Sequence, residues 1–90
     1  MSNFLKLNKD GSIVVDDFVF KPLQGAKVED CFHMPGTVSH NDQVIGSFLA
    51  VFKIANTELI NFRMCNNSVW TDSTNDMEKA VEQFKSIAIF

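Results

Sequence analysis

The sequence of 90 residues contains no tyrosine, one tryptophan, two prolines, four glycines and only two cysteines. Two cysteines are too few for the disulfide framework that small secreted domains use to support a small core. The four glycines form neither a phosphate-binding loop nor a dinucleotide fingerprint, so we expect no cofactor. We expect reduced thiols and a cytoplasmic location, and a single Cys31–Cys65 bridge in a secreted protein is the alternative.

The sequence also lacks a long hydrophobic run and an excess of positive charge. Its longest apolar run, residues 48–52, is far shorter than the roughly 20 residues that span a bilayer, so we expect no membrane segment. The first nine residues include charges and do not resemble a signal peptide. The 8 basic residues are scattered along a chain of net charge −3, which argues against a nucleic-acid-binding protein.

Apolar side chains, in contrast, are abundant. Hydrophobic residues make up 46% of the chain, and nine of them are phenylalanine. Disordered chains have few such residues, so we expect one globular domain over residues 1–90. A chain of this length buries only about 60–65% of its surface when it folds, so its core is small.

The first half of the chain contains strand and turn signals. Asp10-Gly11 predicts a hairpin turn between strands at residues 3–8 and 12–21, and Asp16-Asp17 marks a bulge or splits the second strand. Residues 24–34 fit either a helical turn or an extended segment. Pro35-Gly36 then interrupts the chain, and residues 37–42 are expected to form a loop.

The second half contains the strongest patterns. Residues 43–55 predict a long strand. The following residues, 58–65, alternate between apolar side chains and the polar Asn61 and Arg63, which is typical of a half-buried antiparallel strand. Residues 65–71 suggest a further hairpin. Helical spacing then begins, with an apolar stripe and a capping-box-like pair at Asn75 and Glu78. The stripe consists of Met77, Ala80, Val81, Phe84, Ile87 and Ala88.

These patterns predict an α+β fold, an antiparallel β-meander of four to five strands with one C-terminal α-helix packed on one face. The strand at residues 43–55 is apolar on both faces, because Phe48, Ala50 and Phe52 alternate with Leu49 and Val51. One helix can cover only one face. The second face must be covered by curling of the sheet, by residues 24–42, or by a second protein molecule.

The candidate chemistry is confined to cysteine and histidine. Cys31, His33, His40 and Cys65 are the residue types that bind zinc, but their spacing fits no familiar zinc motif, and we predict no metal site. A thiol needs a nearby base to act as a nucleophile, and neither cysteine has a catalytic signature around it. We therefore predict no catalytic residues.

The sequence favours a small non-enzymatic binding or interaction protein, such as an adaptor, inhibitor or accessory factor. Its partner would be another protein or a second copy in a homodimer, bound through a sheet face or edge. The contact residues predicted are Leu49, Val51, Asn61, Arg63 and Trp70. The alternative is a small-molecule or metal-binding protein, with or without enzymatic activity, that uses Cys31, His33 and His40.

Overall fold

The computed structural model describes residues 4–5 and 7–88. Over these residues the chain forms seven strands and one helix, which together confirm the α+β class. The elements are β1 (Ile13–Val15), β2 (Phe18–Pro22), β3 (Ala26–Val28), β4 (Cys31–His40), β5 (Gln43–Lys53), β6 (Leu59–Asn66), β7 (Val69–Trp70) and α1 (Met77–Ile87).

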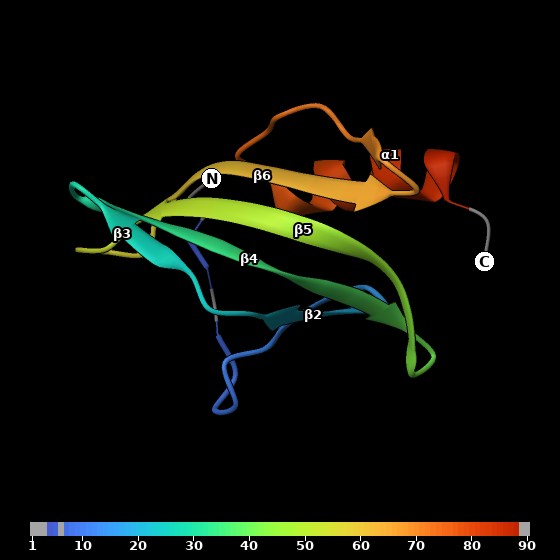
Figure 1. Ribbon diagram of the computed structural model, residues 1–90, viewed down its shortest axis with the longest axis horizontal. Coiled ribbons are helices and arrows are strands. Elements are labelled where there is room, and N and C mark those ends of the chain that lie inside the picture. The colour runs from blue at the N-terminus through green and yellow to red at the C-terminus, as the bar shows by residue number, and fades with distance from the viewer. Residues whose placement is uncertain (1–3, 6, 89–90) are drawn as a thin grey trace.

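The strands form one curved antiparallel sheet in the order β1-β2-β4-β5-β6-β7, with β3 also paired to β4 (Figure 1). β2 pairs with residues 36–40 of β4 and β3 with residues 31–33, so these two short strands lie end to end along one edge of β4. The helix α1 lies behind β6 in this view and also contacts β1, which begins the strand order. The sheet therefore curves around the core, and α1 bridges the strands at its two ends.

The strand count exceeds the predicted four to five because residues 12–21 form two strands and residues 24–42 add β3 and β4. For residues 24–34 the extended alternative is the correct one. The expected interruption at Pro35-Gly36 and the expected loop at residues 37–42 are wrong, since both lie largely within the ten-residue strand β4. Pro35 is tolerated there because it falls at the junction between β3 and β2. Its carbonyl oxygen accepts a hydrogen bond from Leu23 N–H at 2.8 Å, and its missing N–H faces the same junction, outside both ladders.

The predicted N-terminal hairpin is also different. The turn forms at Lys9-Asp10-Gly11, with Gly11 at a φ of 85°, and Asn8 N–H donates to the Ser12 carbonyl oxygen, but the described residues among 3–8 form no strand paired with residues 12–21. Instead, Phe4 bridges Glu58, and Leu5 N–H donates to the carbonyl oxygen of Thr57 at 3.0 Å. Asn3 and Lys6 lie outside the described residues. The predicted strand 12–21 is split at Asp16-Asp17, one of the two outcomes expected, into the hairpin β1–β2.

Two hairpins have tight turns that match their residue types. In the β4–β5 turn Asn41 and Asp42 both have positive φ, and in the β6–β7 turn Asn67 and Ser68 do. Two successive positive φ angles define the type I′ turn, whose twist suits a hairpin, and Asn and Asp tolerate that conformation best. The hairpin expected over residues 65–71 is therefore confirmed.

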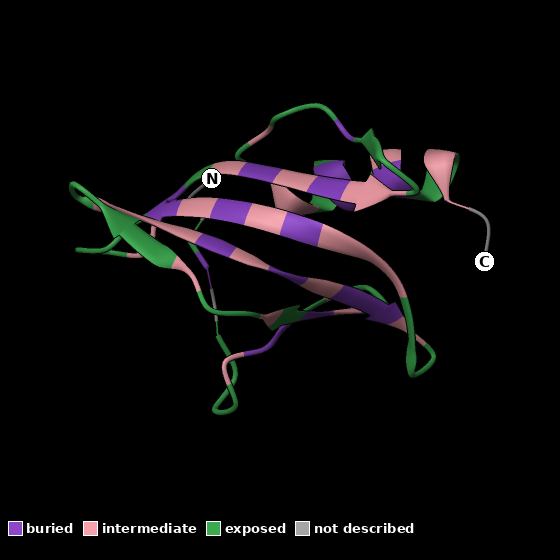
Figure 2. Ribbon diagram, viewed as in Figure 1, coloured by how far each residue is buried: buried purple, intermediate pink, exposed green. Residues whose placement is uncertain are grey.

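Alternation along the central strands separates the core from the other sheet face (Figure 2). The largest fully buried side chains include Phe20 from β2, Phe48 from β5 and Phe62 from β6. Their rings meet across the sheet at centroid distances of 5.3 Å for Phe20–Phe48, 5.4 Å for Phe20–Phe62 and 5.6 Å for Phe48–Phe62. Edge-to-face and offset-stacked pairs at these distances add to the stabilisation that burial alone gives.

Gly36 is required for this aromatic cluster. It is paired with Phe48 across β4 and β5, and a Cβ atom at Gly36 would overlap both the Phe48 ring and the carbonyl oxygen of Lys21. The missing side chain leaves room for the Phe48 ring over β4, where it reaches Phe20. The glycine that looked like a break in the chain is therefore a packing position within a strand.

The N-cap residue of α1 lies one position later than the sequence predicts. Asp76, not Asn75, is the N-cap, and its side chain accepts a hydrogen bond from Glu78 N–H at 3.0 Å. Thr74 is held by a backbone bridge to Phe62 of β6, which fixes the entry into the helix. The buried residues of α1 are Ala80, Val81 and Phe84, which belong to the predicted apolar stripe. Within the described residues, no helix has the length and apolar character that crossing a membrane requires.

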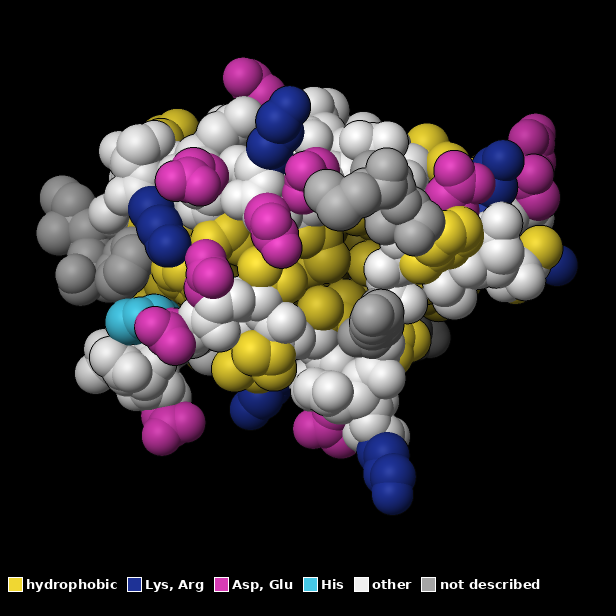
Figure 3. Space-filling model, turned by 180° about the vertical axis from the view of Figure 1, so that it is seen from behind, with side chains coloured by type: hydrophobic (Ala, Val, Ile, Leu, Met, Phe, Trp, Pro, Cys, Tyr) yellow, Lys and Arg dark blue, Asp and Glu magenta, His cyan; other side chains and the backbone are white. Residues whose placement is uncertain are grey.

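Figure 3 shows the molecule from the side opposite to Figure 1, with acidic side chains spread around a central area of hydrophobic ones. The side chains of the hydrophobic core are nevertheless well shielded. They have at most 8% of their surface accessible, and partly buried hydrophobic residues such as Val15, Ile45 and Met77 pack against them. The core therefore lies on the α1 side of the sheet.

We predict that Phe48→Ala lowers the free energy of unfolding by about 3–5 kcal/mol, because it leaves a cavity where three rings meet. Phe4→Ala is the matched control, since the Phe4 side chain is 44% exposed and its loss should cost under about 1 kcal/mol. Urea denaturation measures both. Equal effects of the two substitutions would contradict the assignment of the core.

Candidate functional site

The face of the sheet turned away from α1, which we call the open face, carries every second side chain of the central strands. Directly paired residues of neighbouring strands point to the same face, so the register arranges these side chains in rows across the sheet. The rows are Ala26–His33–Val51–Asn61, Pro35–Leu49–Arg63, and Lys21–Thr37–Ser47–Cys65–Trp70. No described element packs over them.

All five contact residues predicted from the sequence lie on the open face. Leu49 and Val51 are neighbours on β5, and each pairs with one predicted polar residue of β6, Arg63 or Asn61. Trp70 lies at the β7 end of the next row. Leu49 and Val51 are half-buried, and Trp70 is 45% exposed. Residues 24–42 do not cover this face, because they extend the sheet sideways as β3 and β4.

Arg63 and Trp70 form a fixed pair on the open face. The guanidinium carbon of Arg63 lies 4.9 Å from the centroid of the Trp70 ring, within the range of a cation–π interaction. This contact restricts the Arg63 side chain, and its guanidinium forms no ion pair with a described residue. A guanidinium whose motion is already restricted loses little conformational entropy when it binds a planar acceptor such as a carboxylate.

A shallow hollow of about 450 Å³ lies beside these residues, over β3, β4 and β5. Pro35 and Leu49 line it together with His33, and the remaining lining residues are Gln24, Gly25 and Ala26. Gly25 permits the close approach of β3 to β4, because a Cβ atom there would overlap the His33 carbonyl oxygen and the Phe32 ring. The hollow is mainly apolar, with the His33 imidazole as its titratable group.

The charges of the protein are segregated between the strands and the rest of the chain. All 11 acidic side chains lie in turns, loops or α1, and none lies in a strand. The charged strand residues on the open face are Lys21, Lys53 and Arg63, and all three are cationic. A chain of net charge −3 therefore presents a sheet face whose own strand charges are positive.

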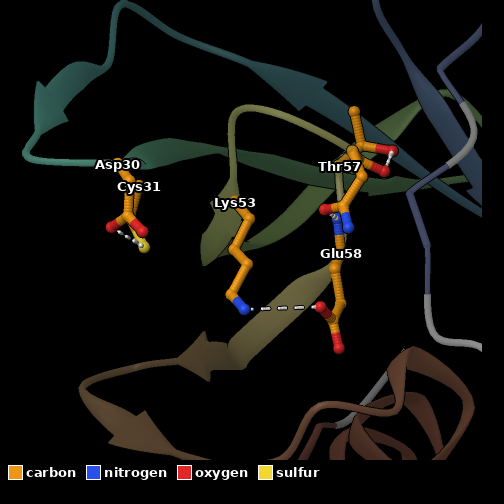
Figure 4. Close-up of polar contacts among 6 residues, drawn as sticks. Asp30, Cys31, Lys53, Thr57 and Glu58 are labelled. Atoms are coloured by element: carbon orange, nitrogen blue, oxygen red, sulfur yellow. Dashed lines mark hydrogen bonds and ion pairs between the residues drawn. The ribbon is translucent and has the colours of Figure 1, made fainter.

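The three cations differ in their surroundings. Lys53 Nζ lies 3.7 Å from a Glu58 carboxylate oxygen (Figure 4), and both side chains are nearly half exposed. Neither Lys21 nor Arg63 forms an ion pair with any described residue. The carboxylate of Asp10 interacts only weakly with Lys21. Its pKa is lowered chiefly because the Ser12 hydroxyl and backbone N–H donate to it, and the charge of Lys21 contributes least. Arg63 and Lys21 are thus the cations available on this face.

Asn61 is the most poorly satisfied polar group on the open face. Its Oδ1 atom is buried and receives no hydrogen bond from the described residues. The β6 strand is irregular here, since Val51 pairs with Asn61 but Phe52 pairs with Leu59, which leaves Ile60 out of the ladder and 45% exposed. A buried acceptor without a donor costs about 1–3 kcal/mol.

The cysteine and histidine candidates are only partly brought together. Cys31 and His33 lie two residues apart on the open face of β4, about 7 Å along the strand, whereas His40 and Cys65 are distant from them. His33 lies in the middle of the open face, whereas His40 is seven residues further along β4, about 23 Å away, and its ring lies 5.2 Å from the core residue Phe18. Cys31 and Cys65 are both free thiols, in rows separated by six residues of β5, or about 20 Å. This distance rules out the alternative Cys31–Cys65 bridge. Among the described residues, no group of three His, Cys, Asp or Glu side chains could hold a metal ion.

Cys31 also has the wrong electrostatic surroundings for a nucleophile. Partial burial raises the pKa of its thiol, and the adjacent Asp30 carboxylate raises it further by accepting a hydrogen bond from Sγ at 3.5 Å (Figure 4). A raised pKa keeps the sulfur protonated at neutral pH, and the protonated thiol is not nucleophilic.

Sequence reasoning missed Lys21, Pro35 and His33 as members of the open face. Their side chains join it only through β4, which was expected to be interrupted. Once β4 is recognised as a strand, alternation places His33 and Pro35 on one face, and pairing with β2 adds Lys21.

We predict that Cys31 is alkylated by iodoacetamide more slowly at pH 7.5 than an unperturbed thiol, and that Asp30→Asn accelerates this alkylation severalfold. The substitution removes the negative charge that raises the thiol pKa. Mass spectrometry of the separate peptides monitors Cys31 against Cys65 as the internal control. An unchanged Cys31 rate in the Asp30→Asn variant would contradict the assignment.

We predict that Asn61→Val raises the free energy of unfolding by about 1 kcal/mol, because it removes an unsatisfied acceptor and places a β-branched residue in a strand. Urea denaturation measures the change. The control is Asn67→Val, at a turn position with a φ of 50°, which should instead be destabilising. A loss of stability in Asn61→Val would show that its amide is satisfied in solution.

Comparison of the chain with protein-family models, with curated proteins and with solved structures found no match. A functional assignment therefore depends on the geometry and chemistry of the open face.

Proposed function

We propose that this chain is a small non-enzymatic binding protein whose open face is its contact surface for another protein. The observation that carries the proposal is the apolar centre of that face. Leu49 and Val51, from the longest strand, lie there without any described element above them, and the partly exposed Trp70 lies in the next row. Aromatic and arginine side chains at the centre of such a surface are typical of binding hot spots.

A sheet face suits this role better than a sheet edge. The two ends of the strand order are β1, with three residues, and β7, with two. Added strands gain affinity from a continuous row of main-chain hydrogen bonds, and these short strands offer few. The open face, in contrast, includes side chains from six strands, β2 to β7.

The non-enzymatic part of the proposal is supported by the surroundings of the reactive groups. Cys31 shares the open face of β4 with His33, but partial burial and the Asp30 carboxylate raise the pKa of its thiol, and His40 is about 23 Å further along the strand. The hollow beside Leu49 is shallow and has only His33 as a titratable lining residue. Two free thiols about 20 Å apart fit a reducing compartment, such as the cytoplasm.

The proposal predicts position-dependent cross-linking in the cells that produce the protein. A photo-crosslinking amino acid at Thr37, on the open face, should give a discrete protein adduct, whereas the same amino acid at the exposed Glu82 of α1 should not. The double substitution Leu49→Asn and Val51→Asn should remove the Thr37 adduct. No adduct at Thr37, or identical adducts at both positions, would contradict the proposal. Circular dichroism checks that each variant is folded.

A further inference from the structure

We propose that the open face binds an acidic protein segment, one that presents carboxylates next to an apolar side chain. The inference rests on the proposed function, because it names the class of partner for the same surface. It is carried by the charges of the face, by the Arg63–Trp70 pair and by the hollow beside Leu49.

The charged strand residues of the open face have one sign. Lys21, Lys53 and Arg63 are its charged strand residues, and the carboxylates of the protein lie in turns, loops and α1. Lys53 is partly neutralised by Glu58, so Arg63 and Lys21 remain. They are separated by three strand spacings, about 14 Å across the sheet. Two separated cations orient a partner that carries carboxylates, and they disfavour partners that carry positive charge.

Arg63 is the main carboxylate contact. Its guanidinium is held over Trp70 at 4.9 Å and has no ion-pair partner among the described residues. A stacked guanidinium can still donate two parallel hydrogen bonds to a carboxylate, and it loses little conformational freedom on doing so. The exposed 45% of Trp70 adds apolar contact next to that charge.

The hollow supplies the apolar half of the site. Leu49 pairs directly with Arg63 on one side and with Pro35 on the other, and both Leu49 and Pro35 line the hollow. Two residues of extended chain span about 7 Å, and Leu49 and Pro35 lie about 5 and 10 Å across the sheet from Arg63. One short segment can therefore place a carboxylate on Arg63 and an apolar side chain in the hollow.

A second copy of the chain fits this surface less well. If two open faces met in a symmetric dimer, Arg63 and Lys21 would find no strand carboxylate on the other copy, and the Glu58 carboxylate is already paired with Lys53. Two buried guanidinium or ammonium groups without counter-charges would oppose association.

Nucleic acid also fits less well. Its phosphates repeat every few ångströms and need a continuous cationic track, whereas this face has only two unpaired cations. Glu29 and Asp30 in the β3–β4 turn and Asp42 in the β4–β5 turn lie at the ends of the sheet, and the net charge of the chain is −3. These carboxylates would repel a phosphate backbone that extends beyond the face.

The test is selection of short random peptides against the full-length chain, followed by titration of a selected peptide using Trp70 fluorescence. We expect enrichment of Asp and Glu beside apolar residues, and binding that weakens as salt rises. Arg63→Glu and the separate variant Lys21→Glu should each weaken binding about tenfold or more. Lys79→Glu on α1 makes the same change in net charge and should leave the affinity within about twofold.

Several outcomes would overturn this inference. Selected peptides without acidic enrichment, or equal losses from Lys79→Glu and Arg63→Glu, would refute an acidic partner. So would tighter binding of single-stranded oligonucleotides, or a concentration-dependent dimer that Arg63→Glu disrupts. If binding is lost in the Leu49→Asn variant but unaffected by the charge reversals, the open face still binds and only the acidic partner is refuted. If Thr37 gives no cross-link and no peptide binds, the proposed function itself fails.

Discussion

The short length of α1 limits what the rest of the structure can do. Eleven helical residues extend about 16 Å, whereas the eleven residues of β5 extend about 36 Å. The helix therefore covers only part of one sheet face, and the sheet must curve until the phenylalanine rings of β2, β5 and β6 meet. The glycine at position 36 makes that meeting possible, because it leaves the space over β4 empty for the Phe48 ring. The second face has no comparable cover among the described residues.

This asymmetry gives the two faces different chemistry. The core face is aromatic and closed, while the opposite face mixes half-buried aliphatic side chains with cations and one tryptophan. The separation follows from strand periodicity, since neighbouring residues of β5 and β6 alternate between the faces. It also explains why an acidic protein can carry a locally cationic surface: its carboxylates are confined to the turns, loops and helix.

The sequence predicts the parts of the fold in which periodicity is unambiguous. The long strand β5, the return strand β6 and the helix α1 are confirmed, and alternation correctly groups Leu49 with Val51 on one side of β5 and Asn61 with Arg63 on one side of β6. The register that brings the two pairs onto one face comes from the structure. Prediction fails at β4. Pro35 and Gly36 have the local preferences of a turn, but the junction between β2 and β3 accommodates the proline and the Phe48 ring requires the glycine. Those tertiary reasons are invisible in the local sequence, so the face residues contributed by β2 and β4 were missed.

The brevity of the outer strands has a consequence for how the protein behaves at high concentration. Exposed strand edges are templates on which further chains can add, and unchecked addition leads to fibrils. The terminal strands β1 and β7 have three and two residues, and the outer strand β3 is bounded by the turn at Glu29-Asp30. Few unpaired main-chain groups are therefore available for stacking, which lowers the tendency of a small aromatic-rich domain with a partly apolar surface to polymerise.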